Sequence, residues 1–528
     1  MVRSGQVRIV MEYNMANRKS KYLTKTRFVN GLACPKWLWL AFNAPDRLPV
    51  AGESSQHRLD EGRRIGELAR QCFPKGILVE SKTVEENVSQ STELVKKRVP
   101  LFEAGFLHSD KLSYARADVL VPVGKDQWDL VEVKGTTEVK EEHIPDMAFQ
   151  HRVYSDAGLK IRRCLVLHLN KAYVRSGEVD LTALFEEEDV TQGVAALAPD
   201  IPATVNELLQ VSRASAAPEF GRGEPFHKDE DGIHTDDAVW KEHPDSDLME
   251  LYYGGKKALG WLEAGTYWRI RDVPRSEFKG NGARQQAIQQ EAYNSGRPHI
   301  DQAKLSSFLK SLQYPLHFLD FETFQPAIPL FDDSWPYQQV PFQFSLHVVE
   351  KPGAKAHHHG YLSMEAKDPR EGFAEALRTV LGTHGHVVAW NASFERGCLK
   401  ELAAHLPEHA GWLGEVDARF VDLLVPFRNF DYYHPAQRGR ASIKAVLPAM
   451  MGKGYDDLAI SDGGSASLAY LEAVWGHIYG VEVPKEQVEA TKRNLEAYCG
   501  RDTEAMVWIV EKLARLCREE GARYEGES

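Results

Sequence analysis

Short apolar runs with the two-residue period of β-strands occur in two separate stretches of this sequence, and helical patterns alternate with them. The first stretch contains ADVLVPV at residues 117–123 and WDLVEVK at 128–134, and the second contains HFLDFETF at 317–324 and HVVAW at 386–390. Strands that alternate with helices form sheets covered by helices. The sequence therefore predicts an α/β chain with a domain at residues 21–195, a second domain at 314–520, and between them a partly helical connector at 196–313 with an exposed acidic loop.

The charge of the chain restricts how it could bind nucleic acid. The 528 residues include 64 Lys and Arg against 76 Asp and Glu, which gives a formal net charge of −12. Bulk charge of this sign does not attract phosphates. A nucleic-acid site must then be a local basic groove, or must use carboxylates that bind divalent cations.

Cysteine usage and hydropathy indicate the compartment. The six cysteines are scattered without a disulfide framework, which fits a reducing cytoplasm. We recognise neither a secretion signal nor a run of 18 apolar residues that could span a membrane. We therefore expect a cytoplasmic protein without a membrane partner.

A β-hairpin with charged residues is predicted at residues 115–137, with its turn at 124–126. Asp118 lies on the first strand, and Glu132 and Lys134 lie on one face of the second because side chains alternate along a strand. The hairpin can bring Asp118 beside Glu132, where the two carboxylates could bind Mg²⁺ or Mn²⁺ for phosphodiester hydrolysis while Lys134 acts at the phosphate. The alternative is a hairpin whose exposed face simply carries charges.

A helical segment follows, with Gln150 and Tyr154 four residues apart on one face. The complete pattern D…ExK…QxxxY resembles the RecB-like branch of the PD-(D/E)XK nucleases, which includes the CRISPR-adaptation exonucleases. The resemblance implies that Asp118 and Glu132 hold the metal and that Lys134 acts at the phosphate. It also implies that Gln150 and Tyr154 contact the DNA strand.

Two further segments bear on this resemblance. EGRRIGELARQCFP at residues 61–74 is similar to an upstream helix of the family, with Gly66 at the position of the family's histidine, so Glu67 or Glu61 would have to replace it. Cys34 matches the first of four cysteines that hold a [4Fe–4S] cluster in relatives.

The three later cysteines of such a cluster are expected after the nuclease core, but residues 213–244 contain none, so no iron–sulfur cluster is expected. His227, His234 and His243 lie in that stretch instead. They are interpreted as solvated loop histidines, with a replacement metal site as the alternative.

The second α/β stretch offers acids from three separated segments. Asp320 and Glu322 lie two apart at the end of a strand, and Glu395 falls in the first turns of a helix. Tyr498 and Asp502 lie four apart on one face of a long amphipathic helix. Such a carboxylate cluster can bind two metal ions for phosphodiester hydrolysis, and a tyrosine beside it can position water.

The order DxE, NxxFE, YxxxD resembles the DnaQ-like 3′–5′ exonucleases of the RNase H-like fold, in the DEDDy subgroup. This resemblance implies a catalytic role for Tyr498 and metal binding by Asp320, Glu322, Glu395 and Asp502. The family normally has Asp where this chain has Glu395, and Asp422 matches a position that is more often structural in relatives. The whole chain is also similar to a family of bacterial fusions, described as a domain of unknown function, that join a RecB-like nuclease to an RNase H-like exonuclease.

Other segments carry weaker signals. His434, Arg438, Arg440 and Lys444 could bind strand phosphates or could be surface charge. GGKKALGWLEAGTYWRIRDVP at residues 254–274 has the small-residue turn and lysine pair of a helix-hairpin-helix-like backbone binder, and His357, His358 and His359 are interpreted as a solvated hairpin tip.

The leading hypothesis is a nuclease with two sites that uses Mg²⁺ or Mn²⁺ and acts on DNA, at the C-terminal site as a 3′–5′ exonuclease, in repair, recombination or defence. The alternatives are an RNA-processing exonuclease and a nucleic-acid-binding protein with only the C-terminal site catalytic. Because no nucleotide-binding P-loop is found, a helicase would have to be a partner.

Overall fold

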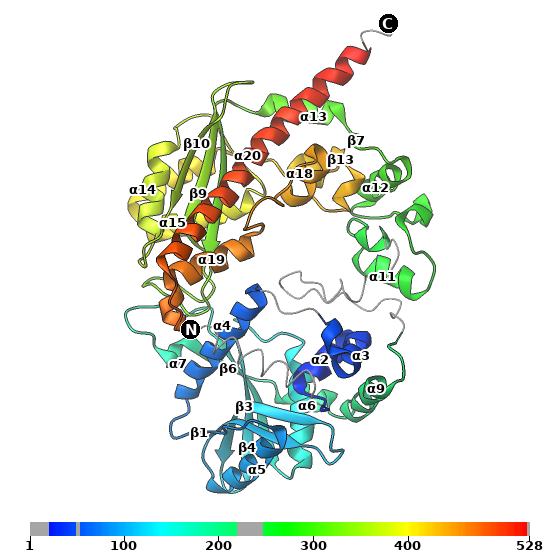
Figure 1. The fold of residues 1–528 in the computed structure, drawn as a ribbon, viewed down its shortest axis with the longest axis vertical. Coiled ribbons are helices and arrows are strands. Elements are labelled where there is room, and N and C mark those ends of the chain that lie inside the picture. The colour runs from blue at the N-terminus through cyan, green and yellow to red at the C-terminus, as the bar shows by residue number, and fades with distance from the viewer. Residues whose placement is uncertain (1–20, 49–52, 219–246, 525–528) are drawn as a thin grey trace. The chain divides into compact units, whose positions relative to one another are not determined.

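The computed structural model describes residues 21–48, 53–218 and 247–524, which form two compact units (Figure 1). The first unit contains the described residues up to 218 together with the segment Pro326–Tyr337. The second contains the remaining residues, from 247 to 325 and from 338 onward. Both units combine helices with a sheet, so the predicted mixed α/β character is confirmed.

The first unit is built on a six-stranded sheet with the strands in sequence order. The first pair and the β4–β5 pair are parallel, and the other neighbours are antiparallel. The predicted hairpin is present, because Val123 lies opposite Gln127 across a turn at residues 124–126. The strands are β1 (Ile77–Leu78), β2 (Leu101–Leu107), β3 (Tyr114–Val123), β4 (Gln127–Lys134), β5 (Lys160–Leu169) and β6 (Phe185–Asp189).

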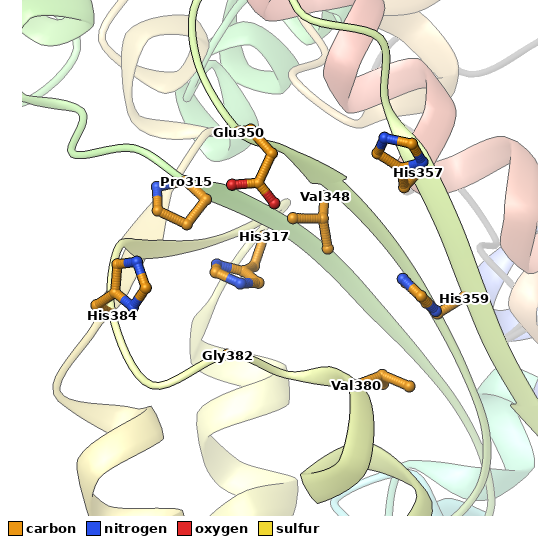
Figure 2. A pocket seen from close by; sticks show the side chains of 9 residues that line it. All are labelled: Pro315, His317, Val348, Glu350, His357, His359, Val380, Gly382 and His384. Carbon is orange, nitrogen blue, oxygen red and sulfur yellow. The ribbon is translucent and has the colours of Figure 1, made fainter.

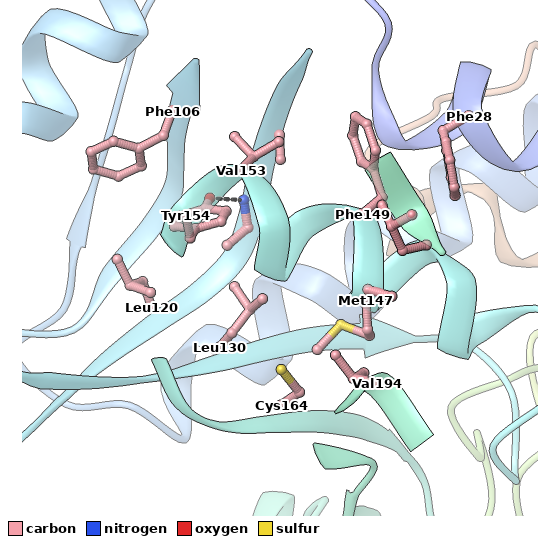
Figure 3. Close-up of a cluster of buried hydrophobic side chains, with 14 of the residues drawn as sticks. Phe28, Phe106, Leu120, Leu130, Met147, Phe149, Val153, Tyr154, Cys164 and Val194 are labelled. Atoms are coloured by element: carbon pink, nitrogen blue, oxygen red, sulfur yellow. Dashed lines mark hydrogen bonds between the residues drawn. The ribbon is translucent and has the colours of Figure 1, made fainter. Parts of the chain in front are cut away.

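Helices cover both faces of this sheet. They are α2 (Lys25–Ala33), α3 (Pro35–Asn43), α4 (Glu53–Gln71), α5 (Val84–Leu94), α6 (His143–Asp156), α7 (Leu181–Leu184), α8 (Thr191–Leu197) and α9 (Ile201–Arg213). Leu120 and Leu130 pack on one face with Met147 and Val153 of α6 (Figure 3), whereas their neighbours on the opposite face pack with α4. Since side chains alternate along a strand, Asp118 and Glu132 lie on the face covered by α6.

The first unit extends beyond the predicted boundary at residue 195. Helix α9 contributes Val205 and Leu208 to the same hydrophobic core as α6, although it was expected in the connector. Pro326–Tyr337 also belongs to this unit, and Arg175 holds it by donating to the carbonyl oxygens of Pro329 at 2.9 Å and Leu330 at 3.0 Å. Apolar packing between segments distant in sequence decides this boundary.

The second unit is built on a five-stranded sheet with the order β10-β9-β8-β11-β12. The pairs β10–β9 and β9–β8 are antiparallel, and β8–β11 and β11–β12 are parallel. A separate antiparallel pair joins β7 (His299–Ile300) to β13 (Tyr432–Tyr433). The five strands of the sheet are β8 (Leu316–Phe324), β9 (Val340–Val349), β10 (His357–Leu362), β11 (His386–Ala389) and β12 (Phe420–Asp422).

Helices lie on opposite sides of this sheet, with α14 and α15 on one side and α19 and α20 on the other (Figure 1). Leu319 and Phe321 pack with the first pair of helices. The alternate residues Asp320 and Glu322 therefore point to the side of α20. The helices of this unit are α11 (Gly255–Glu263), α12 (Ala283–Ser295), α13 (Gln302–Ser311), α14 (Arg370–Val380), α15 (Ser393–His405), α16 (Ala410–Asp417), α17 (Val425–Arg428), α18 (Ile443–Met451), α19 (Gly463–Trp475) and α20 (Lys485–Tyr524).

The predicted connector does not form one body. Its helices α11 and α12 belong to the second unit, where Ala258, Leu262 and Ile270 form a small core. The proposed histidines His227, His234 and His243 lie outside the described residues.

Candidate functional sites

Three carboxylates meet where β3, β4 and α6 come together, and we call Asp118, Glu132 and Asp146 the first acid cluster. Val119 lies opposite Val131 in the β3–β4 register, which places Asp118 next to Glu132 as predicted. Oδ2 of Asp118 accepts a hydrogen bond from the backbone N–H of Val133 at 2.8 Å. The hairpin geometry, which is local in sequence, therefore fixes the position of this carboxylate.

Lys134 and Gln150 connect the three acids. Nζ of Lys134 lies 3.0 Å from Oε1 of Glu132 and 2.8 Å from Oδ2 of Asp146. The amide Nε2 of Gln150 donates to Oε2 of Glu132 at 2.9 Å and to Oδ1 of Asp146 at 3.0 Å. Asp146 was missed by sequence reasoning, although a signal existed, because it lies four residues before Gln150 on the same helix face.

A second lysine enters this cluster from the start of α2. Nζ of Lys25 lies 2.6 Å from Oε1 of Glu132 and 3.3 Å from Oδ1 of Asp118. It is separated from these acids by 107 and 93 residues in the sequence. No local pattern predicts this contact, because only the packing of α2 against the rest of the unit creates it.

Burial and the charges of the two lysines give Asp118 and Glu132 different pKa values. Burial and the charge of Glu132 raise the pKa of Asp118 to about 6. Burial also opposes ionisation of Glu132, but the charges of Lys134 and Lys25 outweigh it and lower the pKa of that carboxyl to about 2. Glu132 is therefore a permanent carboxylate, and Asp118 is the member whose charge depends on its surroundings.

Gln150 and Tyr154 do share a helix face, but that face is turned toward the protein interior. Both side chains are fully buried. The hydroxyl of Tyr154, at the dashed line in Figure 3, accepts from the N–H of Ala117 at 2.7 Å. It also donates to the carbonyl oxygen of Ala104. With its hydrogen-bonding capacity used by the backbone, Tyr154 has a structural position, and the expected contact with a DNA strand does not follow from its geometry.

Three other predicted residues of the first unit lie away from this cluster. Oε1 of Glu61 accepts from the backbone N–H of Ala327 at 2.9 Å, and Glu67 is exposed on α4, which covers the opposite face of the sheet. Cys34 caps α3, since its Sγ accepts from the N–H of Trp37 at 3.2 Å.

Acidic side chains also converge in the second unit, and we call Asp320, Glu322, Glu395 and Asp502 the second acid cluster. Asp320 and Glu322 come from β8, and Asp502 comes from α20, on the side of the sheet that this helix covers. Cys499, one turn before Asp502, places its Sγ 3.7 Å from Oδ2 of Asp320. Within the described ranges, Asp320, Glu322 and Cys499 form the one group of three possible metal-binding residues whose ligand atoms lie within 4.8 Å of one another.

Glu395 stands in the first turn of α15, as predicted, and is 2% exposed. Its Oε2 is buried and has no hydrogen-bond partner among the described residues. Burial and the charge of Asp422 raise the pKa of Glu395 to about 8. Asp422 itself accepts from the backbone N–H groups of Asn391 at 3.0 Å and Leu424 at 2.9 Å, which is the structural role expected of it.

Mutual repulsion and burial dominate the electrostatics of this cluster. Burial, followed by the charge of Asp502, raises the pKa values of Asp320 and Glu322 well above their ordinary range, and the charge of Glu395 adds to both. Burial raises the pKa of Asp502 to about 6, although hydrogen bonds from Tyr455 and Tyr498 lower it. Lys444 lowers the pKa values of Glu322 and Asp502 without cancelling these effects, and four carboxyl groups in this environment offer oxygen ligands of the kind that divalent cations bind.

Two tyrosines and a lysine border the second acid cluster. Lys444 of α18 donates from Nζ to the hydroxyl of Tyr498 at 2.9 Å, and its ammonium lies 4.9 Å from the centre of that ring. The hydroxyl of Tyr455, in the loop after α18, donates to Oδ1 of Asp502. Sequence reasoning found Tyr498 by its spacing from Asp502 but missed Tyr455 and Cys499, because helix and loop packing alone decides which neighbours face the acids.

The other basic and histidine-rich segments do not join this cluster. Arg438 pairs with Glu250 at 2.5 Å, His434 caps its own turn, and Lys257 donates to the carbonyl oxygen of Glu277. Thus Lys444 is the member of the predicted phosphate-binding segment that lies beside the acids. The helix-hairpin-helix-like role assigned to residues 254–274 stays untested.

The three consecutive histidines form the start of strand β10 and not a hairpin tip, because they pair with β9. His357 and His359 line an open pocket with His317 and His384 (Figure 2). Burial, followed by the charge of Arg419, lowers the pKa of His317 to about 4, which keeps it neutral. No three ligand atoms of these described histidines lie within 4.8 Å of one another.

No helix in the described parts of the chain is long and apolar enough to cross a membrane.

Comparisons with known proteins add one match. No curated protein is found to be similar to this sequence. Residues 317–442 match the model of a family described as "Domain of unknown function (DUF2779)", so the chain carries a DUF2779 domain that includes Asp320, Glu322 and Glu395.

Proposed function

We propose that this protein is a metal-dependent nuclease that hydrolyses phosphodiester bonds of DNA, with a 3′–5′ exonuclease site at the second acid cluster. The observation that carries the proposal is the buried Oε2 of Glu395, which has no hydrogen-bond partner among the described residues and contributes to the raised pKa values of Asp320 and Glu322. Buried carboxyl groups in such numbers are neutralised either by protons or by a bound cation, and a cation would allow all four to ionise together. The oxygen ligands fit Mg²⁺ or Mn²⁺.

The arrangement of strands supports an RNase H-like domain. In the order of their appearance, the five strands of the second unit are arranged 3-2-1-4-5, with the second strand antiparallel to its neighbours. The acids occupy the first strand, the helix after the fourth strand and the C-terminal helix. Both features agree with the resemblance to the DEDDy exonucleases.

Asp320, Glu322, Glu395 and Asp502 would hold the cations, which would activate water and stabilise the leaving oxygen of a phosphodiester. Tyr498 receives a hydrogen bond from Lys444, so its own O–H proton is free to point toward a water molecule or Asp502. Lys444 adds a positive charge beside the acids, where an anionic phosphate would bind. Tyr455 fixes the orientation of Asp502.

The first acid cluster supports a second nuclease site. An antiparallel three-strand run, a helix and a parallel strand agree with the core expected of a RecB-like PD-(D/E)XK domain. Asp118 and Glu132 supply oxygen ligands, and Lys134 is held beside them by Asp146. Unlike the second cluster, this one already contains two ammonium groups.

The proposal is tested by degradation of 5′-labelled single-stranded DNA, duplex DNA and RNA by the full-length protein with Mg²⁺ or Mn²⁺. Shortening of the DNA from its 3′ end, lost in Glu322→Gln and retained in the exposed control Glu375→Gln, is expected. Unchanged activity of Glu322→Gln would refute the second site. Faster degradation of RNA than of either DNA would replace the DNA assignment by the RNA-processing alternative.

The first site is tested in the Glu322→Gln background, where remaining cleavage comes from another centre. Lys134→Met keeps the acids and removes the charge expected to act at the phosphate, so the remaining cleavage should disappear. If the background variant already cleaves nothing, the first unit serves to bind nucleic acid and only the C-terminal site is catalytic.

A further inference from the structure

Lys25 has an anchored backbone and a side chain that can move. Thr24 caps α2 by accepting from the N–H of Arg27, and Leu23 is hydrogen-bonded to Leu112 and Tyr114 at 2.8 and 3.0 Å. Phe28 stacks on Phe149 of α6 with ring centres 4.8 Å apart. The backbone at the start of the helix is thus fixed. The side chain of Lys25 is a flexible chain of four carbons that ends in the ammonium group, and it is one quarter exposed.

The ammonium of Lys25 occupies the space that the two hairpin carboxylates share. It contacts Oδ1 of Asp118 and Oε1 of Glu132, whereas the other oxygen of each carboxylate accepts from a protein N–H group. Oδ1 of Asp118 and Oε1 of Glu132 are thus the two oxygens that face each other across one position, which a bridging cation would share with Lys25. The ammonium and the cation compete for one position.

We infer that Lys25 is the built-in counter-ion of the first acid cluster and that a divalent cation binds Asp118 and Glu132 only by displacing it. This inference rests on the proposed function of the first cluster. Three carboxylates and two ammonium groups leave one negative charge there, and exchange of the Lys25 ammonium for a divalent ion brings the net charge to zero. The exchange thereby removes the net negative charge that repels a phosphodiester and places a divalent cation where a phosphate oxygen can bind.

The experiment measures Mn²⁺ binding to the full chain by calorimetric titration, in a background of Asp320→Asn and Asp502→Asn that disables the second cluster. Lys25→Met removes the competing ammonium and keeps the length of the side chain. Lys134→Met removes the same charge from a lysine that also contacts Glu132 but not Asp118. Lys21→Met, on an exposed side chain of the same segment, is the surface control.

The expected result is Mn²⁺ affinity at least about tenfold higher in Lys25→Met than in the background protein, with a smaller gain or a loss in Lys134→Met and no change in Lys21→Met. Lys25→Gln should behave like Lys25→Met, which protects the test against one poorly folded variant. Addition of Asp118→Asn to Lys25→Met should remove the gain.

Three results would overturn the inference. Equal Mn²⁺ affinity in the background protein and Lys25→Met would show that Lys25 and the metal do not compete, while metal use by the first cluster would stand. The same gain in Lys25→Met and Lys134→Met would show a general charge effect without displacement. If Lys25→Met binds no Mn²⁺ at this cluster, both the inference and the metal site of the first unit are refuted.

Discussion

Glu395→Gln should stabilise the metal-free protein at alkaline pH while it abolishes exonuclease activity. The carboxyl group is 2% exposed, and its Oε2 lacks a hydrogen-bond partner among the described residues. Burial and the charge of Asp422 raise its pKa from the ordinary 4.5 to about 8. Folding must therefore hold a proton on this group or bury its charge, and the amide of Gln avoids both costs.

The sign of the pH dependence follows from proton binding in the two states. Below the ordinary pKa of 4.5, Glu395 is protonated in the folded and unfolded protein and does not affect stability. As the pH rises from there toward 8, the unfolded chain releases a proton that the folded protein keeps, so the free energy of unfolding decreases. Above about 8 the full cost is present.

The difference between a pKa of about 8 and the ordinary 4.5 corresponds to an upper limit of about 5 kcal/mol. Relaxation around the charge and entry of water reduce this cost, so we expect Glu395→Gln to gain about 1–3 kcal/mol at pH 8.5. For a unit of this size, that gain corresponds to roughly 2–12 °C in the melting temperature.

Denaturant unfolding in the presence of a chelator, at pH 5.5 and pH 8.5, measures the effect. Glu395→Gln should be more stable than the unmodified protein, with the larger gain at pH 8.5, and the exposed control Glu408→Gln should differ at neither pH. Mn²⁺ should stabilise the unmodified protein more than Glu395→Gln. A gain in the free energy of unfolding that is the same at both pH values, or no gain, would refute the conclusion that burial of the Glu395 carboxyl group destabilises the metal-free protein.

Three further predictions concern individual contacts. Tyr455→Phe removes the hydroxyl that orients Asp502 and should lower the exonuclease rate by about 10–100-fold, with little change in the free energy of unfolding. Tyr498→Phe should lower the rate by about 10–1000-fold. Full activity of both variants in a DNA degradation assay would exclude the tyrosines from the site. Tyr154→Phe leaves the carbonyl of Ala104 and the N–H of Ala117 without their partner. It should lower the free energy of unfolding by about 1–3 kcal/mol in denaturant unfolding and leave DNA affinity unchanged. Weaker DNA binding at unchanged stability would support a contact between Tyr154 and the DNA strand. Cys34→Ser keeps the cap of α3 and should change stability by less than about 1 kcal/mol in a colourless protein, and stoichiometric iron and sulfide in anaerobic preparations would contradict this expectation.

Local periodicity was sufficient to predict the parts of both sites that lie within one element or one hairpin. The turn at residues 124–126 fixes the register of its two strands, so the position of Asp118 beside Glu132 follows from sequence. The two-residue period of β8 likewise places Asp320 and Glu322 on one face. These relations depend on backbone geometry over a few residues, which the sequence encodes directly.

Tertiary packing decided what each predicted face meets. Gln150 and Tyr154 do lie on one face of α6, but that face covers the sheet, so the side chains are buried instead of exposed to a strand of DNA. A periodic pattern identifies a face without identifying its neighbour, because an apolar sheet and a ligand can both select the same spacing. The inclusion of α9 in the first unit has the same origin.

Two of the charges beside the acid clusters come from segments distant in sequence, and no local pattern pairs them with the acids. Lys25 reaches Glu132 across 107 residues, and Lys444 reaches Tyr498 across 54 residues. Coulomb interactions depend on distance in space, and the chain entropy lost in bringing such segments together is offset by packing that is spread over the whole unit. The sequence by itself thus determined which side chains lie together within one hairpin, strand or helix face, including Lys134 and Tyr498, and the tertiary structure alone decided that Lys25, Lys444 and Tyr455 lie beside them, because only packing brings distant segments together.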